Sequence, residues 1–142
     1  MEKLRISRVI KVENDRSLKA FVKAGSYEAD PMGAHHGKAD TLLFHGCPQR
    51  AVPNIEAEGL SLKYASNGML GKGLYGAPDP RKSFQYVGKD KNPDGNFMCI
   101  CRFNLSEAQH AGPSTDHRNW VFDEFCVYKA EHVVVLWVVK LA

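Results

Sequence analysis

The chain has 142 residues, of which 44% are hydrophobic and 25% charged, and it carries a net charge of +3. This is enough for one domain with its own core, and the composition excludes a disordered or fibrous protein. The charge excess is small, and the sequence shows no strongly basic stripe of the kind that many nucleic-acid-binding modules carry, so it does not support binding to a large polyanion. The nearest approach to one, Arg5, Arg8 and Lys11, is expected on the solvent face of a strand.

The cysteines and the apolar segments indicate where in the cell the protein is located. The four cysteines are Cys47, Cys99, Cys101 and Cys126. No apolar run near the N-terminus resembles a signal peptide, and the longest, Val133–Val139, is about a third of a membrane span. We therefore expect a monomer inside the cell, in the cytoplasm or nucleus and off the membrane, with reduced thiols.

A zinc site is the alternative role for two of these cysteines. It would contain the C-x-C pair Cys99 and Cys101. A further ligand would come from His35 or His36. The spacing is not C-x-x-C, and both thiols share one face of a predicted strand among apolar neighbours, so we expect buried thiols and no metal.

Hydrophobic periodicity and capping residues predict the elements in chain order. The first half is predicted to hold a strand (Leu4–Val12), a helix from Asn14 or Asp15 to Gly25, a short strand (Thr41–Phe44) and a helix from Pro48 to Gly59. The second half is predicted to hold an extended segment at Leu74-Tyr75, a helix opened by Asp79-Pro80, and strands at Phe97–Leu105, Val121–Tyr128 and Val133–Leu141. Loops are predicted at 26–40, 63–73, 87–96 and 106–119. Five or so strands with few helices indicate an α+β fold, and the short connections favour mostly antiparallel pairing.

Three places gather polar residues at the ends of apolar segments. His45-Gly46 ends a buried strand, where the histidine can offer ring nitrogens and the glycine permits close approach of a ligand. Ser83 and Tyr86 share a helix face, and with Tyr75 they can hold a flat ring that carries an amide.

Glu124 is the third such residue, because it begins an otherwise apolar strand. A buried carboxylate there is costly without partners. Each of the three places also has a purely structural interpretation: a satisfied histidine, tyrosines in the core, and a glutamate at a solvated strand edge.

The order of these motifs resembles the catalytic domain of the poly(ADP-ribose) polymerase (PARP) superfamily. The motifs are H-G (His45-Gly46), G-x-G-x-Y (Gly71–Tyr75), S-x-x-Y (Ser83–Tyr86) and E-x-x-x-Y (Glu124–Tyr128). The resemblance covers nearly the whole chain through Leu4–Phe21, Leu42–Tyr86, Met98–Leu105 and Glu124–Leu141. His45, Tyr75 and Glu124 match the H-Y-E triad of the diphtheria-toxin-like branch.

The resemblance implies a compact ADP-ribosyltransferase fold of two packed sheets, one catalytic domain over residues 1–142, and NAD⁺ as co-substrate. Gly46 and Ser83 would hold the nicotinamide carboxamide, and Tyr75 and Tyr86 would stack on its ring. His45 would bind a ribose hydroxyl. Glu124 would stabilise the oxocarbenium-like transition state. The implied activity is transfer of ADP-ribose to a protein or nucleic-acid acceptor, in single units because the segment between Leu105 and Val121 is short.

Alternatives remain at this point. The glutamate of the triad also fits polymer formation, and the domain could bind NAD⁺ or ADP-ribose without catalysis. A tRNA 2′-phosphotransferase would need phosphate-gripping arginines that the motifs lack. The departures from the family pattern are Gly76 for an aromatic residue, Cys47 for a small hydroxyl residue, prolines at Pro78 and Pro80, and Val133-Val134-Val135 without a proline.

Overall fold

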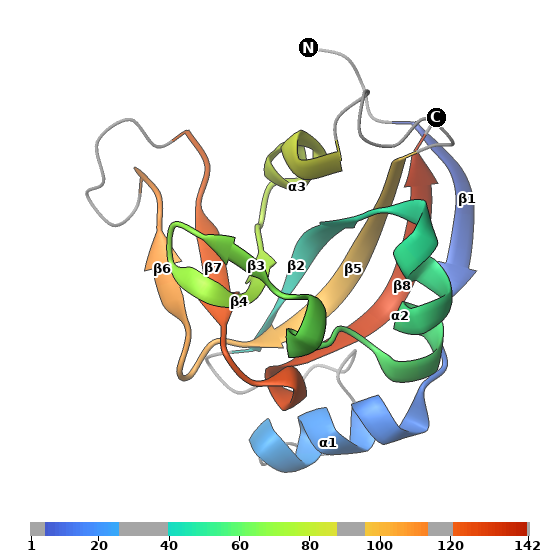
Figure 1. Ribbon diagram of the computed structural model, residues 1–142, viewed down its shortest axis with the longest axis horizontal. Helices are drawn as coiled ribbons and strands as arrows, with labels where there is room; N and C mark the ends of the chain where they lie inside the picture. Colours follow the sequence, from blue (N-terminus) through green and yellow to red (C-terminus); the bar gives the residue numbers. More distant parts are fainter. Residues whose placement is uncertain (1–4, 26–39, 88–95, 114–120, 142) are drawn as a thin grey trace.

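Two antiparallel four-stranded sheets make up most of the structure, a computed structural model that describes residues 5–25, 40–87, 96–113 and 121–141 (Figure 1). A few short helices flank the sheets. The α+β prediction, with antiparallel strands in two sheets, is confirmed.

The first sheet has the strand order β1-β8-β5-β2 and holds the longest strands. Its strands are β1 (Ile6–Lys11), β8 (Val133–Leu141), β5 (Asn96–Asn104) and β2 (Asp40–Cys47). The prediction that the second strand ends at Phe44 is wrong, because His45, Gly46 and Cys47 continue β2 by pairing with β5. Strand β8 lies between β1 and β5, so the first and last parts of the chain share one sheet (Figure 1).

The second sheet has the order β3-β4-β7-β6 and consists of short strands. They are β3 (Ser66–Gly68), β4 (Gly71–Gly76), β7 (Glu124–Val127) and β6 (Gln109–Ala111). The predicted loops at 63–73 and 106–119 are therefore partly wrong, since they contain β3, the start of β4, and β6. Segments such as Ser-Asn-Gly have little strand propensity, so pairing with neighbouring strands decides their conformation. The strand predicted over Val121–Tyr128 is shorter than expected.

In the described parts of the chain, three α-helices connect the strands: α1 (Asp15–Gly25), α2 (Val52–Glu58) and α3 (Pro80–Val87). Short 3₁₀ turns lie at Gln49–Ala51, Leu62–Tyr64 and Ala130–His132. No helix in the described segments has both the length and the apolar character needed to cross a bilayer.

Side-chain caps confirm two predicted helix starts. The Asn14 Oδ1 atom accepts the Ser17 N–H at 3.0 Å, and an Asp79 carboxylate oxygen accepts the Arg81 N–H at 2.9 Å. The Asn14 amide also donates to the Ala57 carbonyl oxygen at 2.8 Å, which ties the start of α1 to α2. The helix predicted from Pro48 begins instead with a 3₁₀ turn and becomes α-helical at Val52.

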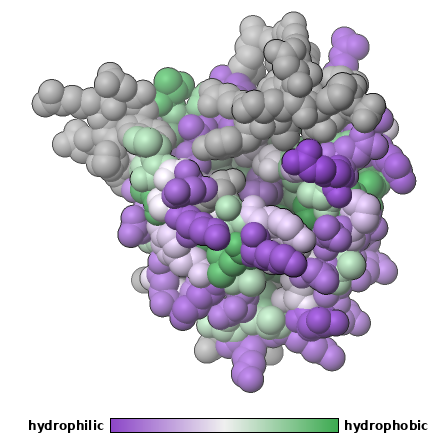
Figure 2. Space-filling model, in the orientation of Figure 1, coloured by the Kyte–Doolittle hydropathy of each residue, from purple (hydrophilic) through white to green (hydrophobic). Residues whose placement is uncertain are grey.

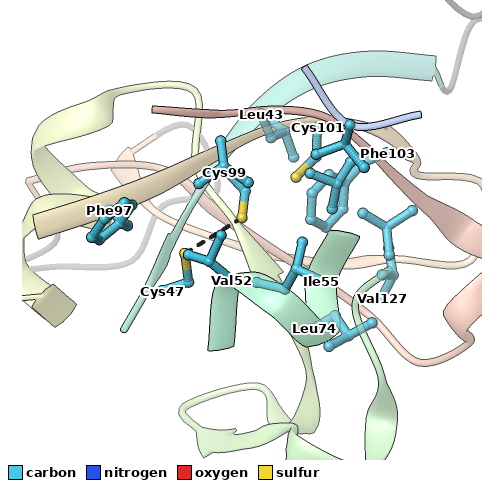
Figure 3. Packing of buried hydrophobic residues seen from close by; sticks show 14 residues of the cluster. Leu43, Cys47, Val52, Ile55, Leu74, Phe97, Cys99, Cys101, Phe103 and Val127 are labelled. Atoms are coloured by element: carbon cyan, nitrogen blue, oxygen red, sulfur yellow. Dashed lines mark hydrogen bonds between the residues drawn. The ribbon is translucent and has the colours of Figure 1, made fainter. Parts of the chain in front are cut away.

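The main core cluster lies between the first sheet, helix α2 and strands β4 and β7, and it includes the thiols of Cys47, Cys99 and Cys101 (Figure 3). All four cysteines are buried and free, which confirms the apolar environment predicted for Cys99 and Cys101. The Cys47 and Cys99 Sγ atoms are 3.6 Å apart. His35 and His36 lie outside the described residues. Within the described part, no group of three or more His, Cys, Asp or Glu side chains could hold a metal ion.

The basic residues near the N-terminus lie at the surface as expected. Arg8 and Lys11 are exposed on β1, and Arg5 is exposed just before it. The face seen in Figure 2 is mainly hydrophilic, with apolar residues in small areas between polar ones.

Candidate functional site

The two sheets meet where β2 runs alongside the end of β4. Phe44 and Ala77 exchange both backbone hydrogen bonds there, with N···O distances of 2.9 and 3.0 Å. This bridge uses the edge of β2 that faces away from β5. It leaves the same edge open one step further along, at Gly46.

The backbone of Gly46 points into this opening. In an antiparallel strand the N–H and C=O groups of alternate residues point to the same side. Since those of Phe44 point to Ala77, those of Gly46 also point away from β5. Gly46 lines a cavity of about 220 Å³ at this position, so the strand edge offers one donor and one acceptor side by side.

Ser83 lies beside this edge, on the first turns of α3. It is buried, and its hydroxyl donates to the Phe44 carbonyl oxygen at 2.9 Å. Because its proton is used in this bond, the Ser83 oxygen keeps lone pairs that can accept a hydrogen bond from a ligand. Helix α3 packs on β2, which holds the serine there.

Glu124, the first residue of β7, also lines this cavity. Only 3% of its surface is exposed, so the interpretation as a solvated edge residue is wrong. The Lys82 Nζ atom lies 3.4 Å from its Oε2 atom. This ion pair offsets part of the cost of burying the carboxylate.

His45 and Tyr75 are joined through the backbone. The His45 Nδ1 atom lies 2.7 Å from the Tyr75 carbonyl oxygen, which can only accept a hydrogen bond, so Nδ1 carries the proton. Burial lowers the pKa of His45 below its ordinary value of 6.5. The ring is therefore neutral at pH 7, and its Nε2 atom is a hydrogen-bond acceptor.

The Tyr75 side chain packs beneath the β3–β4 hairpin. Its hydroxyl accepts the Leu70 N–H at 2.9 Å and donates to the Gly71 carbonyl oxygen at 2.5 Å. The residue is 8% exposed and lines the same cavity as His45 and Glu124. The structure thus brings together His45, Gly46, Tyr75, Ser83 and Glu124 around one cavity. Tyr86 belongs to α3, three residues after Ser83, but its side chain lies outside the described part.

A second cavity of about 600 Å³ adjoins the first, and both are lined by His45, Gly46 and Pro48. Its walls are β2, α2, the 3₁₀ turn at Leu62–Tyr64 and the start of β4. Arg50 and Tyr64 supply a cation and an aromatic ring at this cavity. Because they share His45, Gly46 and Pro48 as lining residues, the two cavities are neighbours.

Two features of the site were not found from sequence. Lys82 directly precedes Ser83 in α3, but its partner Glu124 is 42 positions away in the chain. Gly76 stands where the family pattern has an aromatic residue, but the structure leaves no room for a larger side chain at this position. A Cβ atom there would lie 2.8 Å from the Cζ atom of Phe103 and 3.0 Å from the Cβ atom of Leu43. The Phe103 ring fills the space beneath the cavity.

Comparison with known proteins identifies the family. No curated protein matches the chain. The model of the poly(ADP-ribose) polymerase catalytic domain matches residues 1–111, which include β2, β4 and α3 with the H-G, G-x-G-x-Y and S-x-x-Y motifs. Membership of that family suggests NAD⁺-dependent ADP-ribosyltransferase activity. This chain belongs to the poly(ADP-ribose) polymerase catalytic domain family.

Proposed function

We propose that this chain, as one catalytic domain over residues 1–142, cleaves the nicotinamide–ribose bond of NAD⁺ and transfers single ADP-ribose units to a protein or nucleic-acid acceptor. The observation that carries the proposal is the buried Glu124 carboxylate in the cavity that the open Gly46 edge also lines. The pairing of β8 with both β1 and β5 supports a single domain.

The smaller cavity is proposed to hold nicotinamide. The N–H and C=O groups of Gly46 match the oxygen and the amino group of a primary carboxamide. The Ser83 oxygen supplies a further acceptor for the amino group. Tyr75 and Tyr86 are proposed to stack on the ring, because aromatic side chains favour flat partners.

The larger cavity is proposed to hold the adenosine part. A volume of about 600 Å³ is within the range of sites for small molecules. His45 lies between the two cavities, and its free Nε2 atom is proposed to accept a hydrogen bond from a ribose hydroxyl. Pinning both ends of NAD⁺ would hold the scissile bond in a reactive geometry.

Glu124 is proposed to act on the reacting ribose, as the third member of an H-Y-E triad. Nicotinamide leaves as a neutral molecule, so little acid catalysis is needed, while positive charge develops on the ribose. A fixed carboxylate that binds the 2′-hydroxyl stabilises this charge more in the transition state than in the ground state. Lys82 positions the carboxylate through their ion pair.

The test compares nicotinamide release by the wild type and by Glu124→Gln. The substitution keeps the shape of the side chain and removes its charge, so we expect the rate to fall by about 10²-fold or more with NAD⁺ affinity nearly unchanged. Glu131→Gln is the matched control, because Glu131 is exposed and lies outside both cavities. If the wild type, Glu124→Gln and Glu131→Gln all bind NAD⁺ but release nicotinamide only at the background rate, the proposed catalysis is wrong and the domain is a non-catalytic NAD⁺-binding module.

Product length needs a separate assay with labelled NAD⁺ and an acceptor mixture. Discrete labelled bands on a gel would support transfer of single units. A smear that collapses with Glu124→Gln would instead show polymer formation and contradict this part of the proposal.

A further inference from the structure

The β3–β4 hairpin forms a wall of both cavities. Gly68, the last residue of β3, lines the smaller cavity, whereas Gly73 and Leu74 of β4 line the larger one. A displacement of this hairpin would therefore change the shape of both cavities.

The two residues at the tip of the hairpin have little intrinsic preference for a turn. Gly68 pairs with Gly71, so the loop between them consists of Met69 and Leu70. Two-residue hairpin loops favour Asn, Asp and Gly, which readily adopt positive φ angles, and neither loop residue is of this kind. Gly71, which directly follows them, has a φ of +92° and supplies a glycine where the backbone turns. Contacts from elsewhere in the fold can fix the conformation of Met69 and Leu70 themselves.

Two tyrosine hydroxyls supply hydrogen bonds to this turn. Tyr75 binds the Leu70 N–H and the Gly71 carbonyl oxygen, as described above. Tyr128, which directly follows β7, donates its hydroxyl to the Leu70 carbonyl oxygen at 2.5 Å. Both backbone groups of Leu70 are therefore bound by tyrosine side chains.

The tyrosine rings also pack against the hairpin backbone. A Cβ atom at Gly68 would lie 2.8 Å from the Cζ atom of Tyr75, and one at Gly73 would lie 3.1 Å from the Cδ1 atom of Tyr128. Both rings therefore lie in close contact with the hairpin backbone.

We propose that Tyr128, which lines neither cavity, is a positioning residue for NAD⁺: its hydroxyl holds the β3–β4 turn in the position that gives the two cavities their shape. The inference rests on the proposed function, because it takes the two cavities as the NAD⁺ site. Tyr128 acts through the hairpin and has no direct part in bond cleavage.

The ionisation of both tyrosines is consistent with this role. Burial raises the pKa of Tyr128 to about 12 and raises that of Tyr75 above its ordinary value of 10.0. Both hydroxyls keep their protons at physiological pH and remain donors to the turn.

The test compares the wild type with Tyr128→Phe, which keeps the ring and removes the hydroxyl. We expect the KM for NAD⁺ to rise by about 5- to 10-fold, the effect of one lost hydrogen bond that leaves a carbonyl oxygen unpaired, with kcat changed by less than about twofold. Amide hydrogen exchange should become faster in the segment 68–71. Ser7→Ala is the matched control, since it removes a hydroxyl-to-carbonyl bond of 3.3 Å, to Lys140 in the first sheet.

The outcomes separate this inference from the proposed function. A wild type that neither binds nor cleaves NAD⁺ overturns both. A wild type that cleaves NAD⁺, with the same KM in Tyr128→Phe and Ser7→Ala, overturns the positioning role alone. A raised KM without faster exchange at 68–71 also overturns it, because the effect would then not pass through the hairpin.

Discussion

In the sheet β1-β8-β5-β2, the two central strands are nine residues long and bury apolar side chains over most of their length. In the sheet β3-β4-β7-β6, the strands have three to six residues and include several glycines, and tyrosine hydroxyls bind the backbone of the hairpin turn. The first sheet is thus held by burial of apolar surface, and the second depends more on individual polar contacts. Substitutions in the two sheets should therefore separate stability from ligand binding.

The largest expected effect is on stability, at Phe103 in the first sheet. This side chain is fully buried and packs against Gly76, where it supports the cavity from below. Phe103→Ala should lower the free energy of unfolding by about 3–5 kcal/mol, because it leaves a void in a close-packed core. Urea denaturation measures the loss, and Val9→Ala, at a side chain that is 60% exposed, should cost much less. Equal losses in the two variants would contradict the comparison.

The second prediction concerns ligand binding at Ser83, a residue of α3 that bonds to strand β2. Ser83→Ala removes the hydroxyl that bonds to the Phe44 carbonyl oxygen and is proposed to accept the carboxamide amino group. We expect affinity for nicotinamide and for NAD⁺ to fall about tenfold, as for loss of one well-placed hydrogen bond. Calorimetric titration would measure both affinities. The exposed serine Ser106 provides the control variant Ser106→Ala, and similar affinities in both variants would remove Ser83 from the site.

The smallest effect is a pH dependence of stability that arises from His45. Because burial lowers its pKa in the folded state, the unfolded chain takes up a proton first as the pH falls below about 6.5. The contribution of His45 to stability is complete above this pH and decreases below it, with a slope of less than about 1.4 kcal/mol per pH unit. Urea denaturation at pH 7.5 and 5.5 should show a larger loss for the wild type than for His45→Gln. A smaller loss in the wild type would mean that the folded state raises this pKa.

Sequence predicted the parts of the fold that depend on local pattern. Alternating apolar residues identified β5 and β8, and capping residues identified the starts of α1 and α3. The strands β3 and β6 were missed because their pairing depends on neighbours and their own residues have little strand propensity.

Sequence also predicted some features of the candidate site and missed others. The motif residues that line the smaller cavity were named from sequence through the order of the motifs that resembles the family. Two contacts were missed: the ion pair between Lys82 and Glu124, and the bond from Tyr128 to the Leu70 carbonyl oxygen. Both join residues more than 40 positions apart, and no local pattern marks such pairs.

The bridge between Phe44 and Ala77 has a consequence for cofactor choice. The bridge ends before Gly46, so the backbone N–H and C=O groups of Gly46 are left at the cavity for a ligand to bind. In the proposed binding mode, a carboxamide pairs with these groups as another strand would. In that mode, nicotinic acid, which lacks the amino group, would turn a negative oxygen toward the Gly46 carbonyl, so we expect the amide form of the dinucleotide to bind more tightly than its acid analogue.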